Sequence, residues 1–318
     1  MKVALTMILY NEEKVLLRCL NSVLPLIDYY IIVDTGSTDK TKIIAKDFFE
    51  EKDIPGEIHD APNFNMSENL NFAFGKLKEN KIDFAFYIDA DNILSIPEKF
   101  NAANLKKELE HYHSGMITVK SEDNEYGKRL FYNLSHNWTW QGVIHEVATC
   151  EEEKMITYKS NLQLIIHNDG NSWTSQSVKE KYLRHADIIL KDIELNGMTS
   201  RNVFYLAQSY RDAGEHEKAI EWYSKRLPMM GFYEEVYVSQ LNIAILKWTL
   251  NKSIMEVADE FMYCNELDSL RAEHLYHLKL MYERNGRPKC AAKIHELLKT
   301  YKNPYPKRML FLNPNAYI

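Results

Sequence analysis

Residues Phe84–Asn92 read FAFYIDADN, a short apolar run that ends in two aspartates separated by one residue. A run of this length between polar residues is typical of a buried β-strand. Side chains two apart on an extended segment share a face, so Asp89 and Asp91 are predicted to point the same way. Two carboxylates this close repel each other unless a cation lies between them, and Mg²⁺ or Mn²⁺ with oxygen ligands is the natural candidate. The stretch therefore predicts a buried strand that leads into a metal–diphosphate site.

The residues before this stretch alternate between strand and helix patterns. Such alternation predicts an α/β fold with a largely parallel sheet, whose ligands bind at the carboxyl ends of the strands. Asp34 and Asp89 both fall at such ends, so two separate strands bring acidic groups to one crevice. The strands are expected at Lys2–Leu9, Tyr30–Val33, Ile58–Asp60 and Ile82–Ile88, and the helices at Glu12–Leu24, Thr41–Glu51 and Ser67–Glu79, the last with Ser67 as its N-cap.

From residue 115 to 166 the pattern changes to short strands without a long helix, which we expect to complete the same sheet. A long helix is predicted next, over Ser175–Leu195. At 318 residues the chain suits two domains. We expect a catalytic-type α/β domain over residues 1–172 and an all-α domain over residues 173–318.

The second half of the chain contains an internal repeat. Tyr210, Gly214 and Ala219 recur in the same order and spacing at Tyr282, Gly286 and Ala291. The shift of 72 residues between the copies is about two periods of a 34-residue helix–turn–helix repeat of the tetratricopeptide kind. The copy between them is degenerate, and a plain helical bundle with a chance match is the alternative.

Composition excludes several classes of function. A net charge of −6, without a basic run, offers no attraction for nucleic acid or an anionic membrane surface. The apolar runs are too short to span a membrane. The four scattered cysteines lack metal-ligand spacing and are expected to be reduced thiols of a cytoplasmic protein.

Three segments taken together carry a specific resemblance. Asn11-Glu12-Glu13, Asp34–Asp39 (DTGSTD) and Asp89-Ala90-Asp91, in this order and at these spacings, resemble a family-2 glycosyltransferase with a GT-A fold. WxGxIHE at residues 140–146 and IIH at 165–167, followed by helical repeats, are similar to a subgroup with C-terminal tetratricopeptide-like helices. The bacterial peptide S-glycosyltransferases have this layout.

The resemblance implies a metal-dependent transfer of a sugar from a nucleoside diphosphate. Mn²⁺ or Mg²⁺ held by Asp89 and Asp91 would offset the charge on the leaving diphosphate, with Asp91 as the more direct ligand. A histidine near the end of the domain often completes the metal shell, and His167 stands at that position. A hydrogen-bonded histidine that ends a strand is the alternative for His167.

The resemblance also implies a set of nucleotide-sugar contacts. The family uses an aspartate at the position of Asp34 for the nucleoside, and a carboxylate accepts from an imide N–H such as that of uracil. The segment Phe64–Asn69 resembles a segment of the family that usually contains an arginine. Glu68 occupies the position of that arginine here, so one expected cation near the nucleotide is missing. Arg129 could instead form a surface salt bridge, and Trp140 could instead pack in the core. The full set expected around the nucleotide-sugar is Tyr10, Glu12, Asp34, Thr35, Gly36, Asn69, Asp89, Ala90, Arg129 and Trp140.

An inverting transfer needs a general base on the acceptor side. Glu146 is the expected base, with His145 orienting it or binding the acceptor, and Asp169 is the second candidate. UDP is the expected nucleotide and UDP-glucose the expected donor. The helical domain favours a polypeptide or glycan acceptor and allows a homodimer.

Three other readings differ in class. A non-catalytic tetratricopeptide protein with a relic nucleotide-binding domain would not bind uridine diphosphate in a metal-dependent way. A sugar nucleotidyltransferase needs a Gly- and Arg-rich phosphate loop after the first strand, where this chain has Asn11-Glu12-Glu13. A nicotinamide dehydrogenase needs a Gly-x-Gly-x-x-Gly turn that is missing here.

Overall fold

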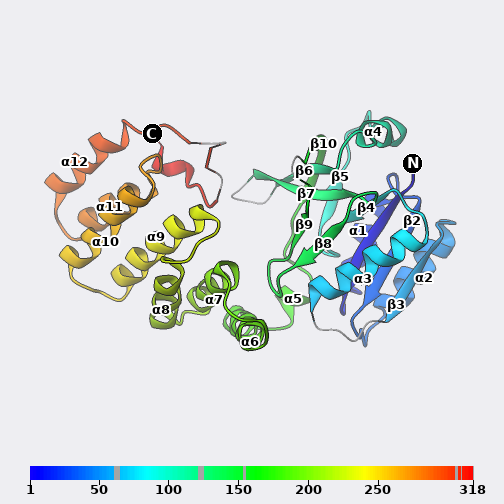
Figure 1. Cartoon of the computed structure of the whole chain (residues 1–318), viewed down its shortest axis with the longest axis horizontal. Helices are drawn as coiled ribbons and strands as arrows, with labels where there is room; N and C mark the ends of the chain where they lie inside the picture. Colours follow the sequence, from blue (N-terminus) through cyan, green and yellow to red (C-terminus); the bar gives the residue numbers. More distant parts are fainter. Residues whose placement is uncertain (61–64, 121–124, 153–154, 305–306, 309, 318) are drawn as a thin grey trace. The chain divides into compact units, whose positions relative to one another are not determined.

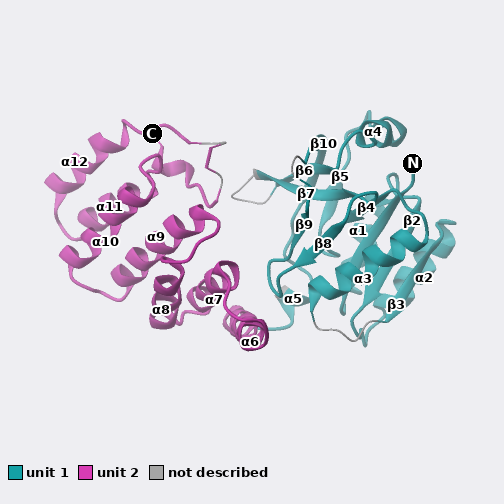
Figure 2. Cartoon of the chain, viewed as in Figure 1, with its two compact units in different colours: residues 1–177 teal, residues 178–318 magenta. Residues whose placement is uncertain are grey.

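The computed structural model describes residues 1–60, 65–120, 125–152, 155–304, 307–308 and 310–317. It divides the chain into two compact units, Met1–Ser177 and Val178–Ile318 (Figure 2). The sequence-based division after residue 172 falls inside a short helix, α5 (Asn171–Thr174). Phe64, part of the segment compared above, lies outside the described residues.

The first unit contains a mixed sheet and a separate hairpin (Figure 1). The sheet has the order β3-β2-β1-β4-β7-β6-β10-β5, and β8 pairs with β9 apart from it. The strands are β1 (Val3–Leu9), β2 (Tyr29–Asp34), β3 (Gly56–Asp60), β4 (Phe84–Tyr87), β5 (Ile93–Ser95), β6 (Ser114–Lys120), β7 (Glu125–Asn133), β8 (Trp138–Gln141), β9 (Val147–Cys150) and β10 (Thr157–Ile165).

Strand direction decides where a ligand can bind. β1 is parallel to β2 on one side and to β4 on the other. The chain runs outward from β1 to β2 and β3 and then returns with β4 to the other side of β1, so the topological switch point lies between β1 and β4. β7 is antiparallel to both β4 and β6. We call the region beyond the ends of β1, β2 and β4 the carboxyl edge. In open α/β sheets, ligands bind in the crevice at such an edge.

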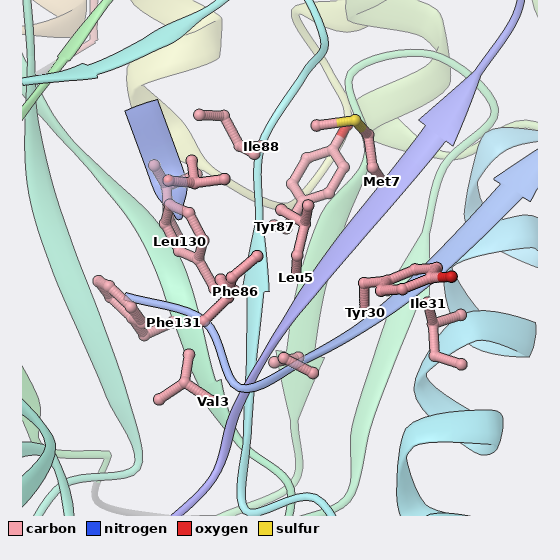
Figure 3. Close-up of a cluster of buried hydrophobic side chains, with 14 of the residues drawn as sticks. Val3, Leu5, Met7, Tyr30, Ile31, Phe86, Tyr87, Ile88, Leu130 and Phe131 are labelled. Carbon is pink, nitrogen blue, oxygen red and sulfur yellow. The ribbon is translucent and has the colours of Figure 1, made fainter. Parts of the chain in front are cut away.

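The core explains why β1 is apolar at every position except Thr6. Val3, Leu5 and Met7 are fully buried, and they lie among side chains from β2, β4 and β7 (Figure 3). Phe86 of β4 stacks on Phe131 of β7, with ring centroids 4.8 Å apart. A parallel strand covered on both faces must be apolar on both, and β1 satisfies this requirement.

The helices of this unit are α1 (Leu16–Val23), α2 (Thr41–Glu51), α3 (Met66–Glu79) and α4 (Ala102–Leu109). The expected start of α1 at Glu12 was wrong. The backbone N–H of Glu12 donates to the Thr41 hydroxyl and its carboxylate accepts from Asn171, so residues 12–15 form a turn instead. The expected N-cap of α3 was also wrong, because Asn65, not Ser67, accepts the hydrogen bond that begins this helix.

The second unit is helical. Within the described residues its helices are α6 (Val178–Asn196), α7 (Ser200–Asp212), α8 (His216–Arg226), α9 (Tyr233–Thr249), α10 (Ile254–Leu267), α11 (Glu273–Arg284) and α12 (Pro288–Leu298), followed by the short η1 (Pro314–Ala316). Each of α6 to α12 packs against the next one along the chain. An all-α second half, as the sequence predicted, is confirmed.

The repeat detected in the sequence is a repeated backbone turn. Gly214 between α7 and α8 and Gly286 between α11 and α12 both have a positive φ, at 77° and 66°. In each turn the following N–H donates to the carbonyl five residues earlier, from Glu215 to Tyr210 and from Arg287 to Tyr282. This is the hydrogen bond of a helix that ends in a left-handed residue.

The degenerate middle copy has the same turn. Asn251, between α9 and α10, has a φ of 56°, and the N–H of Lys252 donates to the carbonyl of Lys247. Asparagine is the residue after glycine that best tolerates the left-handed conformation. Three successive helix pairs therefore share one connection, although only two of them use glycine.

No helix among the described residues is both long enough and apolar enough to cross a lipid bilayer.

Candidate functional site

Asp34 is the last residue of β2 and is buried at the carboxyl edge. Its Oδ1 accepts hydrogen bonds from the N–H groups of Gly36 (3.0 Å) and Ser37 (2.8 Å). Gly36 has a φ of 102°, which explains the glycine in this turn. Within the described residues, Oδ2 of Asp34 is buried without a hydrogen-bond partner, and the side chain as a whole is 1% exposed. An orphaned buried acceptor of this kind suits a ligand N–H.

Residues at the end of β1 form hydrogen bonds with the turn that follows Asp34. The hydroxyl and N–H of Thr35 both donate to the carbonyl of Leu9, at 3.0 Å and 2.9 Å. Asn11 donates its N–H to the Ser37 hydroxyl and accepts from the N–H of Thr38. Thr35 therefore has a structural use for its hydroxyl, whereas Tyr10, next to this junction, is 48% exposed.

Asp89 and Asp91 follow β4 at the same edge, in different surroundings. The Tyr87 hydroxyl donates to Oδ1 of Asp89 at 2.5 Å, and the Asn92 amide donates to Oδ2 at 3.3 Å. The ammonium of Lys128 lies 3.6 Å from Oδ2 of Asp89. Ala90 between the two aspartates is buried in the core. Asp89 is thus largely engaged by protein groups.

Asp91 instead faces other acidic groups. Burial and the charge of Asp89 raise the pKa of Asp91 above its usual range. Burial also raises the pKa of Glu12 to about 7, against the N–H of Asn171, with further contributions from the charges of Asp91, Asp39 and Asp89. Neighbouring negative charges thus contribute to the raised pKa of both Glu12 and Asp91, so the cluster is short of positive charge, and oxygen donors of this kind fit Mg²⁺ or Mn²⁺.

The segment after β10 closes this side of the site. A Cβ added to Gly170 would lie 3.0 Å from Oδ2 of Asp91 and 3.1 Å from Oε2 of Glu12, so its backbone approaches both carboxylates closely. Asp169 forms an ion pair with Arg18 of α1, which lowers the pKa of Asp169. A carboxylate held in this way is a weak base, and this disfavours Asp169 as the general base.

His167 lies near this cluster without joining it. It is exposed, and its charge acts on Asp169. Among the described residues, the donor atoms of His167, Asp89 and Asp91 do not come within 4.8 Å of one another as a group. The three predicted metal ligands are therefore not assembled into a closed shell.

The hairpin of β8 and β9 contacts the end of β4, where the ring of Trp140 meets that of Tyr87. Trp140 is buried, with edge contacts to Phe74 and Tyr87 and a tilted contact to Tyr132, so its ring packs in the core below the site. Residues 142–146 connect the strands, and His145 has a φ of 56° in this connection. The charge of Glu146 contributes to the raised pKa of Tyr87, which places Glu146 near the Tyr87–Asp89 pair.

The remaining predicted contacts differ in position. Asn69 is buried on α3, whose Asn71 exchanges two hydrogen bonds with the backbone of Trp140. The guanidinium of Arg129 lies 5.3 Å over the ring of Trp138. Lys128, which sequence reasoning missed, is the β7 residue that reaches Asp89. The one sequence signal for Lys128 was its position next to Arg129, which was already predicted to bind the nucleotide-sugar.

A second cluster of possible metal ligands consists of His113, His136 and Glu152. Both imidazoles contact the carboxylate of Glu152. The N–H of Ile156 donates to Nδ1 of His113, so the ring proton of neutral His113 is on Nε2, which donates to Glu152 at 2.7 Å. A metal would need the Nε2 lone pair of His113, which the ring proton occupies in this arrangement. The cluster is therefore a set of hydrogen bonds that connects three loops.

The sheet order, the flanking helices and the acidic carboxyl edge together define a GT-A-type domain followed by a helical region. The sequence profile of glycosyl transferase family 2 matches residues 5–183, more than half of the chain. The chain belongs to this family, and the predicted fold class is confirmed.

Two curated relatives are similar to this chain. The SPbeta prophage-derived glycosyltransferase SunS of Bacillus subtilis (strain 168) is 24% identical over 226 residues, which cover 69% of this chain and 52% of the relative. The glycosyltransferase SunS of Bacillus phage SPbeta matches with the same values. The chain thus spans about half the length of these relatives.

Similar solved structures are more distant. S. aureus TarS has a TM-score of 0.40 at 13% identity, covering 85% of this chain and 55% of that one. TarS 1–349 in complex with UDP has a TM-score of 0.36 at 13% identity, covering 93% and 90%. Neither likeness adds to the family assignment.

Proposed function

We propose that this protein is a metal-dependent, inverting glycosyltransferase that uses a UDP-sugar donor. The observation that carries the proposal is the acidic cluster at the carboxyl edge. There Glu12 and Asp91 are half-buried, the pKa of Glu12 is raised by burial and by the charges of Asp91, Asp39 and Asp89, and the pKa of Asp91 is raised by burial and by the charge of Asp89. A divalent cation would relieve this repulsion and neutralise charge on the leaving diphosphate. Asp91 and Glu12 are the residues best placed to hold it, with His167 as a further ligand after a local movement.

Asp34 supports a nucleoside at this site. Its Oδ2 is a buried acceptor without a partner in the described part of the chain, while Oδ1 is already satisfied by the turn. An acceptor left unpaired in the interior is costly, and an imide N–H from a uracil ring would satisfy it. Tyr10, exposed beside this turn, would cover the base or ribose.

The transfer itself needs a base and an open path for the acceptor. The acceptor nucleophile forms a bond to the anomeric carbon, the bond from that carbon to the diphosphate oxygen breaks, and the electron pair leaves with UDP. The acceptor proton passes to the base. Glu146 is the proposed base because it lies near the Tyr87–Asp89 pair on a connection that is partly exposed. His145, beside it and exposed, would contact the acceptor.

The acceptor is proposed to be a polypeptide or a glycan. The three helix pairs with a common turn favour a tetratricopeptide-like unit, and such repeats present extended surfaces. UDP-glucose is the proposed donor, and dimerisation through the helical unit remains part of the proposal. SunS, the curated relative, is a glycosyltransferase by name, which agrees with the reaction class.

The test is a donor-hydrolysis screen with UDP-, GDP- and dTDP-sugars, with and without Mn²⁺. We expect turnover of a UDP-sugar only with Mn²⁺, and we expect Asp91→Asn to reduce it at least a hundredfold. Asp47→Asn, on the exposed face of α2, is the matched control and should leave the rate unchanged. Equal rates for Asp91→Asn and wild type would refute the metal assignment.

A non-catalytic role for the α/β unit is the alternative. It would leave the acidic cluster without a function, and it predicts no metal-dependent UDP binding by calorimetry. Metal-dependent binding of UDP would exclude this alternative.

A further inference from the structure

Residues 167–171, which we call the crossing segment, follow β10 and meet the carboxyl edge from the side. Three separate contacts hold the segment there. Asp169 contacts α1, the backbone of Gly170 lies against Asp91 and Glu12, and the N–H of Asn171 donates to Oε2 of Glu12 at 3.0 Å. Asp169 and Asn171 also line a cavity of about 220 Å³ together with Glu12 and other residues of the loop after β1. The crossing segment is therefore a wall of the proposed site.

Arg18 of α1 connects this wall to the aspartate that follows β4. Its Nη1 donates to Oδ2 of Asp169 at 2.9 Å, and its Nη2 donates to Oδ1 at 2.7 Å. The same Nη2 donates to the backbone carbonyl of Asp91 at 3.0 Å. One rigid guanidinium thus fixes two segments that are far apart in the sequence, and a planar fork holds a carboxylate with defined geometry.

Fold stability does not explain this arrangement. The side chains of Arg18 and Asp169 are 34% and 42% exposed, and ion pairs with this much solvent contact contribute little to folding. The local charge is more informative. Asp169 is a further carboxylate near Asp91, and its charge contributes to the raised pKa of Asp91. The guanidinium of Arg18, paired with Asp169, offsets part of that negative charge.

We propose that Arg18 is a positioning residue of the donor site. It holds the backbone of Asp91 in place, and it keeps the carboxylate of Asp169 turned away from the cation that Asp91 would bind. This inference rests on the proposed function and adds to it a residue outside the motif segments quoted from the sequence above. Neighbouring groups that orient a metal ligand commonly change metal affinity by about ten- to a hundredfold.

The test measures UDP binding by calorimetry with and without Mn²⁺, on the full chain. For Arg18→Met we expect at least tenfold weaker UDP binding in Mn²⁺, unchanged weak binding without metal, and a melting temperature close to that of wild type. Arg18→Lys keeps the positive charge and loses the two-pronged guanidinium. Its affinity for UDP in Mn²⁺ should lie between those of wild type and Arg18→Met. The control is Lys46→Met, which removes an exposed ion pair with Glu50 on α2 and should bind like wild type.

A double variant separates positioning from simple charge neutralisation. Arg18→Met combined with Asp169→Asn should stay as weak as Arg18→Met, because the contact to the Asp91 carbonyl is still lost. Recovery of wild-type binding in the double variant would overturn the positioning role. The positioning role would also be overturned if Arg18→Met bound UDP as tightly as wild type, or if it lost the same amount of UDP affinity with and without Mn²⁺.

The outcome for the wild type distinguishes the two hypotheses. If wild type binds UDP in a Mn²⁺-dependent way and Arg18→Met does the same, only the inference about Arg18 fails. If wild type shows no Mn²⁺-dependent binding, the proposed function fails and the role of Arg18 fails with it.

Discussion

Two adjacent basic residues of β7 make different contacts. Lys128 reaches Asp89, whereas Arg129 lies over the ring of Trp138. The pairing of β6 with β7 is irregular at this point, because the register shifts between Gly115 and Met116. A sequence pattern does not reveal such an irregularity, and the choice between two adjacent cations was therefore decided by the tertiary structure.

This difference gives a prediction at the scale of one residue. Lys128→Met should weaken UDP binding by about three- to tenfold, roughly 1 kcal/mol, because the site loses its cation beside Asp89. Arg129→Met should change UDP binding less and stability more, since its guanidinium packs on an aromatic ring. Calorimetry and thermal unfolding of both variants provide the comparison. A larger binding loss for Arg129→Met would reverse the assignment.

Much of the site at the residue scale follows from where strands end. Asp34, Asp89 and Asp91 all lie at the carboxyl edge, as alternation of strands and helices predicted. Their individual partners did not follow from the pattern. The Tyr87 hydroxyl on Asp89 and the close backbone of Gly170 at Asp91 come from segments that only the folded chain brings together.

At the scale of elements, local signals predicted the longer helices well. α2 has the predicted bounds, Thr41–Glu51. α1 begins later than expected because the N–H of Glu12 donates to the Thr41 hydroxyl and its carboxylate accepts from the N–H of Asn171, which hold Glu12 in a turn. The short strands β5, β8 and β9 escaped prediction, since three or four residues carry too little periodicity to be recognised.

The repeated turn of the helical unit gives an element-scale prediction. Asn251→Ala should destabilise the protein by about 1 kcal/mol, because alanine resists a positive φ. Asn251→Gly should be neutral or slightly stabilising, since glycine adopts this conformation without strain. Urea unfolding of both variants tests the argument. Equal stability of the alanine and glycine variants would mean that the turn does not need a left-handed residue.

Gly214 offers a matched control for this experiment. A Cβ at Gly214 would meet no atom within 4 Å, so Gly214→Ala changes only the backbone preference. We expect it to cost about the same as Asn251→Ala, roughly 1 kcal/mol. Very different costs would indicate that the turns are not equivalent.

At the scale of the molecule, the helical unit buries charge that the sequence did not reveal. Arg271 is fully buried between Glu234 and Glu273, and His274 beside them is fully buried as well. Burial and then the Arg271 charge lower the pKa of His274 to about 4, while Asp268 acts weakly in the opposite direction. The Tyr237 hydroxyl is its hydrogen-bonding partner at Nδ1.

This group predicts acid sensitivity. The unfolded chain takes up a proton on His274 near pH 6.5, whereas the folded chain does so only near pH 4. Stability therefore falls as the pH drops below 6.5, by about 2 kcal/mol between pH 7.5 and 5.0 from this residue. Urea unfolding at the two pH values should show a smaller difference for His274→Gln. An unchanged difference would assign the acid sensitivity to other groups.

The sequence by itself determined an α/β unit with acidic strand ends, a helical second half and the family to which the chain belongs. These features are local or repeat at fixed spacing, so hydrophobic periodicity and ordered motifs are enough to predict them. Only the tertiary structure decided which groups face Asp91, which cation reaches Asp89 and that a third turn matches the other two. Those outcomes depend on contacts between segments distant in sequence, and no local pattern encodes the distance at which two such segments meet.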